Sequence, residues 1–455
     1  MIDFITMSMQ RIVKVRPGEG RALFWSFGYF FCLMASYYVL RPLRDEMGVA
    51  SGVGNLQWLF TATFVVMLAA VPLFGAVVAR LPRRRFIPLV YHFFVANIAI
   101  FWLLLTWDVG KVYVARTFFV WISVFNLFAV SVFWSFMADL FSSEQGKRLY
   151  GFIAAGGSAG ALAGPLLTVA LAVPLGPTNL LIIAAVLLEI AVLCAHQLER
   201  AASRFGKGVR SAALGADSAT ARSESGGLGG GWMAGFTLVL RSRYLAGIGL
   251  WVFLLSLAGT FLYFTQANIV ACASEDPAVR TRIFATIDLA VAVLTLLAQC
   301  TVTGRLISRF GVGPAVAFLP LVFAVGFAVL ALRPVLHVVA AFQAIQRAAN
   351  FAVSNPAREI LFTVTAPEEK YKAKYVIDGV TFRGADAING WFFAVLREMG
   401  FSLSAIATMT IPVMVGWLAV AIFLGREHER RARKSTWPAA LPNEESTAIT
   451  AGDLE

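Results

Sequence analysis

The stretch Glu144-Gln-Gly-Lys-Arg-Leu-Tyr150 returns half a chain later as Glu369-Lys-Tyr-Lys-Ala-Lys-Tyr375, with Glu, Lys and Tyr at the same spacing. A second segment, Gly75 to Arg80, has a counterpart at Gly304 to Arg309. The two share their first and last residues, Gly and Arg, at the same spacing. Each copy is short and charged and lies between long apolar segments. Membrane proteins built from two similar halves commonly bind their substrate where the halves meet and alternate access by rocking one half against the other. The repeat therefore predicts a transporter.

The composition points to a lipid environment, because 59% of the 455 residues are hydrophobic and only 14% are charged. A soluble domain could not cover so much apolar surface, whereas a bilayer solvates it. A helix needs about 20 apolar residues to cross the hydrocarbon layer. The sequence predicts an all-α membrane protein with twelve transmembrane helices, at 22–40, 56–79, 86–107, 112–137, 149–171, 179–197, 244–268, 283–304, 313–332, 336–363, 377–396 and 402–424.

The net charge of +12 is explained by membrane topology. With twelve helices and a cytoplasmic N-terminus, most Lys and Arg fall on the cytoplasmic segments, as the positive-inside rule requires. No basic soluble domain is left to bind nucleic acid. The basic start, residues 1–21, leads into a full-length apolar helix and predicts an uncleaved first span. We expect a multi-pass protein of the cell's inner (plasma) membrane with both termini in the cytoplasm.

The chain divides at one segment that lacks apolar periodicity and is rich in Ala, Ser, Gly and Arg. We predict an N-terminal six-helix bundle over 1–200, a flexible cytoplasmic linker over 201–236 and a C-terminal six-helix bundle over 237–434. The charged and polar tail over 435–455 is predicted to be disordered. Two pseudo-symmetric six-helix bundles around a long inner loop resemble the major facilitator fold.

Two short motifs also resemble that superfamily. Gly75-Ala-Val-Val-Ala-Arg-Leu-Pro-Arg-Arg84 is similar to its inner-loop signature G-x-x-x-D-R-x-G-R-R, with Ala79 in place of the usual Asp. The resemblance implies a gating role for Arg80 and for its second-half counterpart Arg309. Glycines at positions 156, 160 and 164 resemble the antiporter signature of the superfamily, although close helix packing by small residues explains the same pattern.

Polar residues inside the predicted spans mark the candidate cavity, because burying them in a bilayer costs several kcal/mol unless they face a cavity. The tenth span carries the densest set, spaced so that all five residues share one helix face: Gln343, Arg347, Asn350, Ser354 and Arg358. The eleventh span adds Arg383, Asp386 and Asn389, the eighth adds Asp288, and the fourth adds Arg116 and Asn126.

The expected cavity is mildly cationic, because intramembrane arginines outnumber carboxylates. Guanidinium groups suit phosphate and carboxylate oxygens and stay charged when poorly hydrated, so an anionic substrate is favoured. The alternative is pairing within the protein, of Arg358 with Glu359, of Arg383 with Asp386, and of Asp288 with Arg280 or Arg282. Arg347 has no carboxylate three or four residues away and is expected to be free for substrate. The isolated His92 and Glu189 are expected to serve packing or an interface.

Three stretches resemble the ATP/ADP translocase family of nucleotide exchangers. They are Tyr37-Tyr-Val-Leu-Arg-Pro-Leu-Arg-Asp45, then Phe133-Trp-Ser-Phe-Met-Ala-Asp139, and Glu368-Glu-Lys-Tyr-Lys-Ala-Lys-Tyr-Val-Ile-Asp378 followed by Arg383-Gly384. The resemblance implies that Arg44 stands at the position of an important family lysine, Asp139 at that of a functional acidic residue and Lys374 at that of a functional lysine. Lys374 could instead be a loop charge that sets topology.

The sequence therefore predicts a monomeric antiporter that exchanges nucleotides or a related phosphorylated or anionic metabolite, with no covalent chemistry, cofactor or metal. The expected substrate-binding residues are Arg44, Arg116, Asn126, Gln343, Arg347, Asn350, Lys374 and Arg383. The expected gating or coupling residues are Arg80, Asp139, Asp288, Arg309, Arg358 and Asp386. Two alternatives stay open: a proton-coupled carrier of drugs or neutral solutes in which Asp288 carries the proton, and a non-transporting or lipid-handling membrane module.

Overall fold

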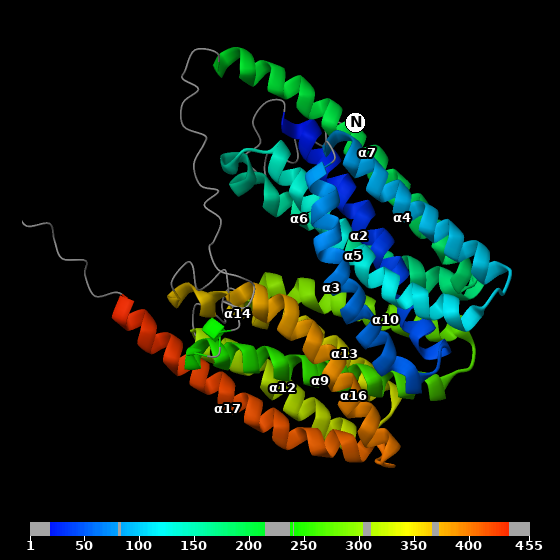
Figure 1. Ribbon diagram of the computed structural model, residues 1–455, viewed down its shortest axis with the longest axis vertical. Helices are drawn as coiled ribbons and strands as arrows, with labels where there is room; N and C mark the ends of the chain where they lie inside the picture. The colour runs from blue at the N-terminus through cyan, green and yellow to red at the C-terminus, as the bar shows by residue number, and fades with distance from the viewer. Residues whose placement is uncertain are drawn as a thin grey trace, which may run out of the picture.

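A computed structural model describes residues 19–80, 83–213, 237–239, 241–303, 311–365 and 373–435. Every regular element within these ranges is helical (Figure 1). The first group of elements comprises α2 (Glu19–Ala50), η1 (Val53–Asn55), α3 (Leu56–Arg80), α4 (Arg83–Thr106), α5 (Lys111–Leu140), α6 (Ser143–Leu175) and α7 (Pro177–Ala213). The second comprises α9 (Arg243–Ala273), α10 (Pro277–Ala298), η2 (Gln299–Thr303), α12 (Val312–Leu332), α13 (Leu336–Ala349), η3 (Asn350–Ser354), α14 (Asn355–Leu361), η4 (Phe362–Val364), η5 (Tyr375–Thr381), α16 (Phe382–Glu398) and α17 (Leu403–Ser435).

Ten helices in the described part of the chain are long and apolar enough to cross a membrane. Each of them falls on one of the predicted spans, so a multi-pass all-α protein is confirmed for these residues. The other two predicted spans, 336–363 and 377–396, fall on helices that π-helical turns interrupt, η3 in the first and η5 in the second. Both also carry the polar residues from which a cavity was predicted, and neither is among the ten.

The buried apolar side chains form two large clusters, one for each group of helices. Tyr29, Phe30 and Phe133 lie in the first, where the rings of Phe30 and Phe133 stack with centroids 4.1 Å apart. Trp251 and Trp417 lie in the second, with ring centroids 5.4 Å apart. The second cluster also takes in side chains from the start of α3, so the two groups share packed surface there.

The boundaries of the predicted linker differ in part from the helices observed. The amphipathic helix α7 continues to Ala213, past the predicted linker start at residue 201. Residues 214–236 lie outside the described ranges, as do residues 436–455 of the predicted tail. The division into two bundles joined by a linker stays a prediction.

The first copy of the repeated motif begins helix α6. Ser142 and Gln145 form a reciprocal capping box at its N-terminus, which satisfies two backbone N–H groups that a helix start leaves open. Gln145 and Arg148 also donate to the buried carboxylate of Glu19 at the start of α2, each at 3.0 Å. The motif therefore fastens α6 to α2. The corresponding residues 369–372 of the second copy lie outside the described part.

Close packing of α6 on α2 explains the glycine run. A Cβ atom built on Gly156 would lie 2.6 Å from the carbonyl oxygen of Phe27, and one on Gly164 would lie 2.7 Å from that of Ala35. Real Cβ atoms do not approach so closely, so only glycine lets the two backbones touch. The packing interpretation of this run is confirmed, while an antiport-specific role stays a prediction.

The two groups of helices meet near one end of the molecule, at the right of Figure 1, where the C-terminal end of α2 lies beside α10. Helix α3 packs on α16, and α10 packs on both α2 and α6. The N-terminal end of α6 and the short helix α14 lie toward the left of the view (Figure 1).

Candidate functional site

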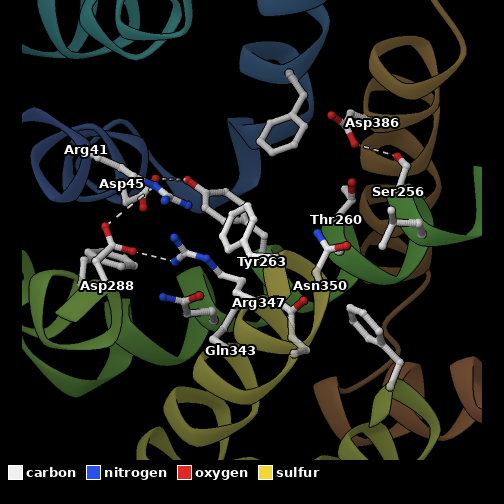
Figure 2. Close-up of a pocket in the computed structure, with 18 of the residues that line it drawn as sticks. Arg41, Asp45, Ser256, Thr260, Tyr263, Asp288, Gln343, Arg347, Asn350 and Asp386 are labelled. Carbon is white, nitrogen blue, oxygen red and sulfur yellow. Dashed lines mark hydrogen bonds and ion pairs between the residues drawn. The ribbon is translucent and has the colours of Figure 1, made fainter. Parts of the chain in front are cut away.

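A cavity of about 260 Å³ lies between the two groups of helices, close to the size range of small-molecule sites. Helices α2, α3, α9, α10, α12, α13, η3 and α16 provide its walls (Figure 2). The lining side chains are mainly charged, amide-bearing or aromatic. They include Arg41, Arg44, Asp45, Phe60, Ser256, Thr260, Tyr263, Gln266, Phe284, Asp288, Phe323, Gln343, Gln346, Arg347, Asn350, Phe351, Phe382 and Asp386.

Asp288 of α10 lies between two arginines from different helices (Figure 2). Arg347 of α13 donates through Nη1 to Oδ1 of Asp288 at 2.6 Å. Nε of Arg41 in α2 lies 3.8 Å from Oδ2 of the same carboxylate. The Asp288 side chain is only 3% exposed, and burial of that kind strengthens the attraction between charges. We expected Arg347 to be unpaired, and that prediction was wrong because the partner comes from a neighbouring helix.

A second carboxylate, Asp45, links α2 to α9. The hydroxyl of Tyr263 donates to its Oδ1 at 3.0 Å, and Nε of Arg44 lies 3.7 Å from the same oxygen. The Arg44 guanidinium also lies over the ring of Phe119, 4.4 Å from the centroid, a favourable cation–π arrangement. Arg44, predicted from the family resemblance, therefore does line the cavity.

The third carboxylate, Asp386, accepts a 2.7 Å hydrogen bond from Ser256, and Ser256 accepts one of 3.3 Å from Asn389. Arg383 lies 3.8 Å from Asp386, as the predicted pairing required. Arg383 itself lines a smaller adjoining cavity of about 40 Å³, together with Arg44 and Asp386.

Amide side chains of α13 and η3 form another part of the wall. Gln346 donates to Gln343 at 2.7 Å, and both side chains are buried. Within the described residues, the buried Asn350 Oδ1 has no hydrogen-bond partner, and the same is true of Arg347 Nη2 and Asp288 Oδ2. Buried polar atoms are normally satisfied, so these three atoms mark places where a polar ligand would gain hydrogen bonds.

The charges that line the central cavity balance, with three arginines and three aspartates. The expected cationic excess is therefore wrong for this cavity. The prediction erred because it counted arginines by span, and three of the four that it counted, Arg116, Arg358 and Arg383, lie outside this lining.

The structure brings together only some of the predicted substrate-binding and gating residues. Arg44, Gln343, Arg347, Asn350, Asp288 and Asp386 line the cavity. Six others lie outside that lining: Asn126, Asp139, Arg358, Arg383, Arg116, which donates to the Ser51 carbonyl at 3.4 Å, and Lys374, which pairs with Glu359 at 2.6 Å. The side chain of Arg80 and the whole of Arg309 fall outside the described residues.

The π-helical turn η3 explains why the polar face of the tenth predicted span is not continuous. Gln343, Arg347 and Asn350 precede or begin the turn and face the cavity. A π turn inserts an extra residue into each hydrogen-bonded ring and rotates the residues that follow. Arg358 accordingly lies away from the cavity and pairs with Asp378 of η5 at 3.3 Å. The alternative of pairing within the protein therefore holds for Arg358, although its partner is Asp378 and not Glu359.

Sequence reasoning missed an ion pair between the two groups of helices. Arg280 of α10 donates to Glu46 of α2 at 2.7 Å, and both side chains are largely buried. The pairing of Asp288 with Arg280 or Arg282 was therefore wrong. Arg41, Asp45 and Glu46 all lie in or beside the stretch quoted for its family resemblance, so the charges clustered there were the available signal.

Aromatic residues extend this contact between the two groups. Trp391 of α16 donates to the Thr61 hydroxyl of α3 at 3.0 Å. Its ring also meets that of Trp58 edge-on at 4.6 Å. The Arg280–Glu46 pair and these two contacts together form what we call the inter-group latch.

His92 and Glu189, expected to serve packing or an interface, lie near each other on α4 and α7. Nε2 of His92 is 3.5 Å from Oε2 of Glu189. Both side chains are well exposed, and neither lines the cavity.

Comparison with known proteins agrees with this arrangement. The sequence profile of the Major Facilitator Superfamily matches residues 22–374. The chain is 29% identical over 109 residues to ADP,ATP carrier protein 2 of Chlamydia pneumoniae, a match covering 23% of this chain and 20% of the carrier. The match therefore spans about a fifth of the carrier's own length.

Solved transporter structures share the fold over nearly the whole chain. The nucleoside transporter NupG superimposes with a TM-score of 0.59 at 14% identity, covering 92% of this chain and 100% of that one. A POT family transporter in complex with 5-aminolevulinic acid gives 0.57 at 13% identity, covering 91% and 97%. Identities this low show the fold alone. Because the superfamily profile matches residues 22–374, most of the chain, this protein belongs to the Major Facilitator Superfamily and is a membrane transporter rather than an enzyme.

Proposed function

We propose that this protein is an antiporter that exchanges nucleotides, or a related phosphorylated or anionic metabolite, by alternating access. The observation that carries the proposal is the convergence of Arg41 and Arg347, from different helix groups, on one carboxylate in the central cavity. A phosphate or carboxylate of a substrate presents the same oxygen geometry to guanidinium groups. The match to an ADP,ATP carrier supports the nucleotide class.

The inter-group latch supports a rocking mechanism. Its contacts join α2 and α3 to α10 and α16 at one end of the cavity. Two bundles that alternate access must break such contacts when the cavity opens on that side. We place the protein in the inner membrane as a monomer, with both termini cytoplasmic and with bundles over 1–200 and 237–434.

Exchange is tested with purified protein in liposomes loaded with ADP and supplied with labelled ATP outside. We expect ATP uptake to require internal ADP and to fall at least about tenfold in Arg347→Gln, because a charged hydrogen bond is worth about 1.5–3 kcal/mol. Arg397→Gln is the matched control, since the exposed Arg397 lies outside the cavity lining and donates to the Phe401 carbonyl. Uptake that ignores internal ADP would contradict the proposal.

A second candidate is a proton-coupled carrier of neutral or dipolar solutes. The equal number of arginines and aspartates around the cavity favours it, because a dipolar solute could satisfy both signs of charge. The same liposomes distinguish the two candidates. Uptake of a neutral nucleoside that follows an imposed pH gradient, with no dependence on internal nucleotide, would favour the second.

A further inference from the structure

We propose that Asp288 is a built-in competitor of the substrate anion: it occupies Arg41 and Arg347 in the empty protein, and a bound anion takes its place. The inference rests on the proposed anion exchange and deepens it. Asp288 then both selects for a strongly coordinating anion and makes transport depend on exchange.

The geometry of the three side chains supports competition. Asp288 bonds Arg347 at 2.6 Å but contacts Arg41 only at 3.8 Å, so its hold on the second guanidinium is loose. Within the described residues, Oδ2 of Asp288 and Nη2 of Arg347 have no hydrogen-bond partner although both are buried. A carboxylate and a guanidinium group that are incompletely satisfied can be rearranged at low cost.

The charge balance of the cavity shows why the Asp288 carboxylate must be displaced before an anion can bind. Every arginine of the lining has an aspartate beside it, Arg44 through Asp45 and the other two through Asp288. An incoming phosphate therefore meets no unpaired cation and gains strong bonds only where an aspartate releases one. Asp288 is the candidate because one release frees two guanidinium groups at once.

The position of the triad connects this competition to movement. Arg41 belongs to α2, whereas Asp288 and Arg347 belong to α10 and α13 (Figure 2). Their attraction holds the two helix groups together when no anion is present. An anion that coordinates both arginines replaces the bond to Asp288. The anion can move with the arginines when the protein changes state, whereas Asp288 is fixed to α10. The empty protein is then slow to change state, and such a restraint converts a uniporter into an exchanger.

Asp288→Asn tests the inference, with Asp108→Asn as the matched control because Asp108 is exposed and pairs with the exposed Lys111. We expect the Asp288 variant to bind ADP about tenfold more tightly in titration calorimetry, since removing the carboxylate frees two charged donors. In liposomes it should also take up ATP without internal ADP. Weaker ADP binding than wild type, or an unchanged requirement for internal ADP, would overturn the inference.

A ligand-free measurement separates this inference from the proposed function. In a background without native cysteines, a thiol is placed at the buried Ser51, five residues after Glu46 of the inter-group latch. Faster alkylation of that thiol in Asp288→Asn than in its parent supports the restraint, and an equal rate contradicts it. If wild-type protein binds neither ADP nor inorganic phosphate, the proposed function fails, and the alkylation rates alone decide whether Asp288 restrains the empty protein.

Discussion

At the scale of single residues, the main feature is a set of buried ion pairs between residues that lie far apart in the chain. Arg280 and Glu46 are separated by more than half the chain, and so are Arg41 and Asp288. Such a pair adds little net stability when compared with an apolar pair of the same shape, but removing one partner leaves an uncompensated charge. Comparing single with double variants therefore separates the stability lost to an uncompensated charge from the loss of the ion pair's role in transport.

We expect Arg280→Gln to lower the thermal unfolding midpoint in detergent, because breaking a buried pair costs about 3–5 kcal/mol. The double variant Glu46→Gln with Arg280→Gln should recover most of that loss, since no charge is then left alone. Lys111→Gln is the control: its pair with Asp108 is exposed and contributes about 0–1 kcal/mol. An unchanged midpoint in Arg280→Gln would show that the pair is not buried in the folded protein.

Sequence patterns found the residue types of the site more reliably than their partners. The Arg383–Asp386 pair was predictable because it lies within one helical turn. The Asp288–Arg347 pair was not, since which face of α10 meets α13 depends on packing that no local spacing records. Arg41 was hidden for the same reason, although it stands three residues before the predicted Arg44.

Helix regularity matters at the scale of single elements. The seam between α2 and α6 depends on glycines, and Gly160 lies where a Cβ would collide with the Phe31 carbonyl and the Ala35 backbone nitrogen. The spacing of the glycines predicted close helix packing, although not that α2 is the partner. Periodicity could not predict η3, because a π turn leaves no distinct composition and yet changes which residues of the tenth span face the cavity.

Gly160→Leu should prevent α2 and α6 from packing and sharply reduce the yield of monodisperse protein, because overpacking costs about 1–3 kcal/mol or more where backbones cannot move. Gly151→Leu in the same helix is the control, since nothing lies within 4 Å of a Cβ built there. Size-exclusion profiles in detergent measure the difference. Equal profiles for the two variants would contradict a seam of touching backbones.

At the scale of the whole molecule, the order of apolar segments was enough to predict an all-helical membrane protein. Ten predicted spans are long and apolar enough to cross a bilayer. The two that fall short are the ones with the most polar residues, because lining a cavity replaces apolar side chains by charged and amide ones. Composition therefore predicts membrane-spanning helices best where the helices carry few polar residues that line the cavity.

Movement between the helix groups is tested by tying them together. With native cysteines replaced, we expect a short thiol cross-linker between Thr61→Cys and Trp391→Cys to abolish ATP uptake, because their 3.0 Å contact joins α3 to α16. The control pair is Trp102→Cys with Asn179→Cys, which lie 3.3 Å apart on α4 and α7 within one group. Cross-linking that control should leave most uptake intact. Full uptake by the cross-linked Thr61–Trp391 variant would exclude rocking about this end.

The glycine seam has a mechanical consequence. Backbones in direct contact cannot slide past each other, so α2 and α6 behave as one stiff lever with Arg41 and Arg44 on it. The other surface of α6 rests on α10, which carries Asp288. A force applied by an anion to the arginines is thus delivered to α10 through the packing of α6 on α10, even after the anion has displaced Asp288 from them.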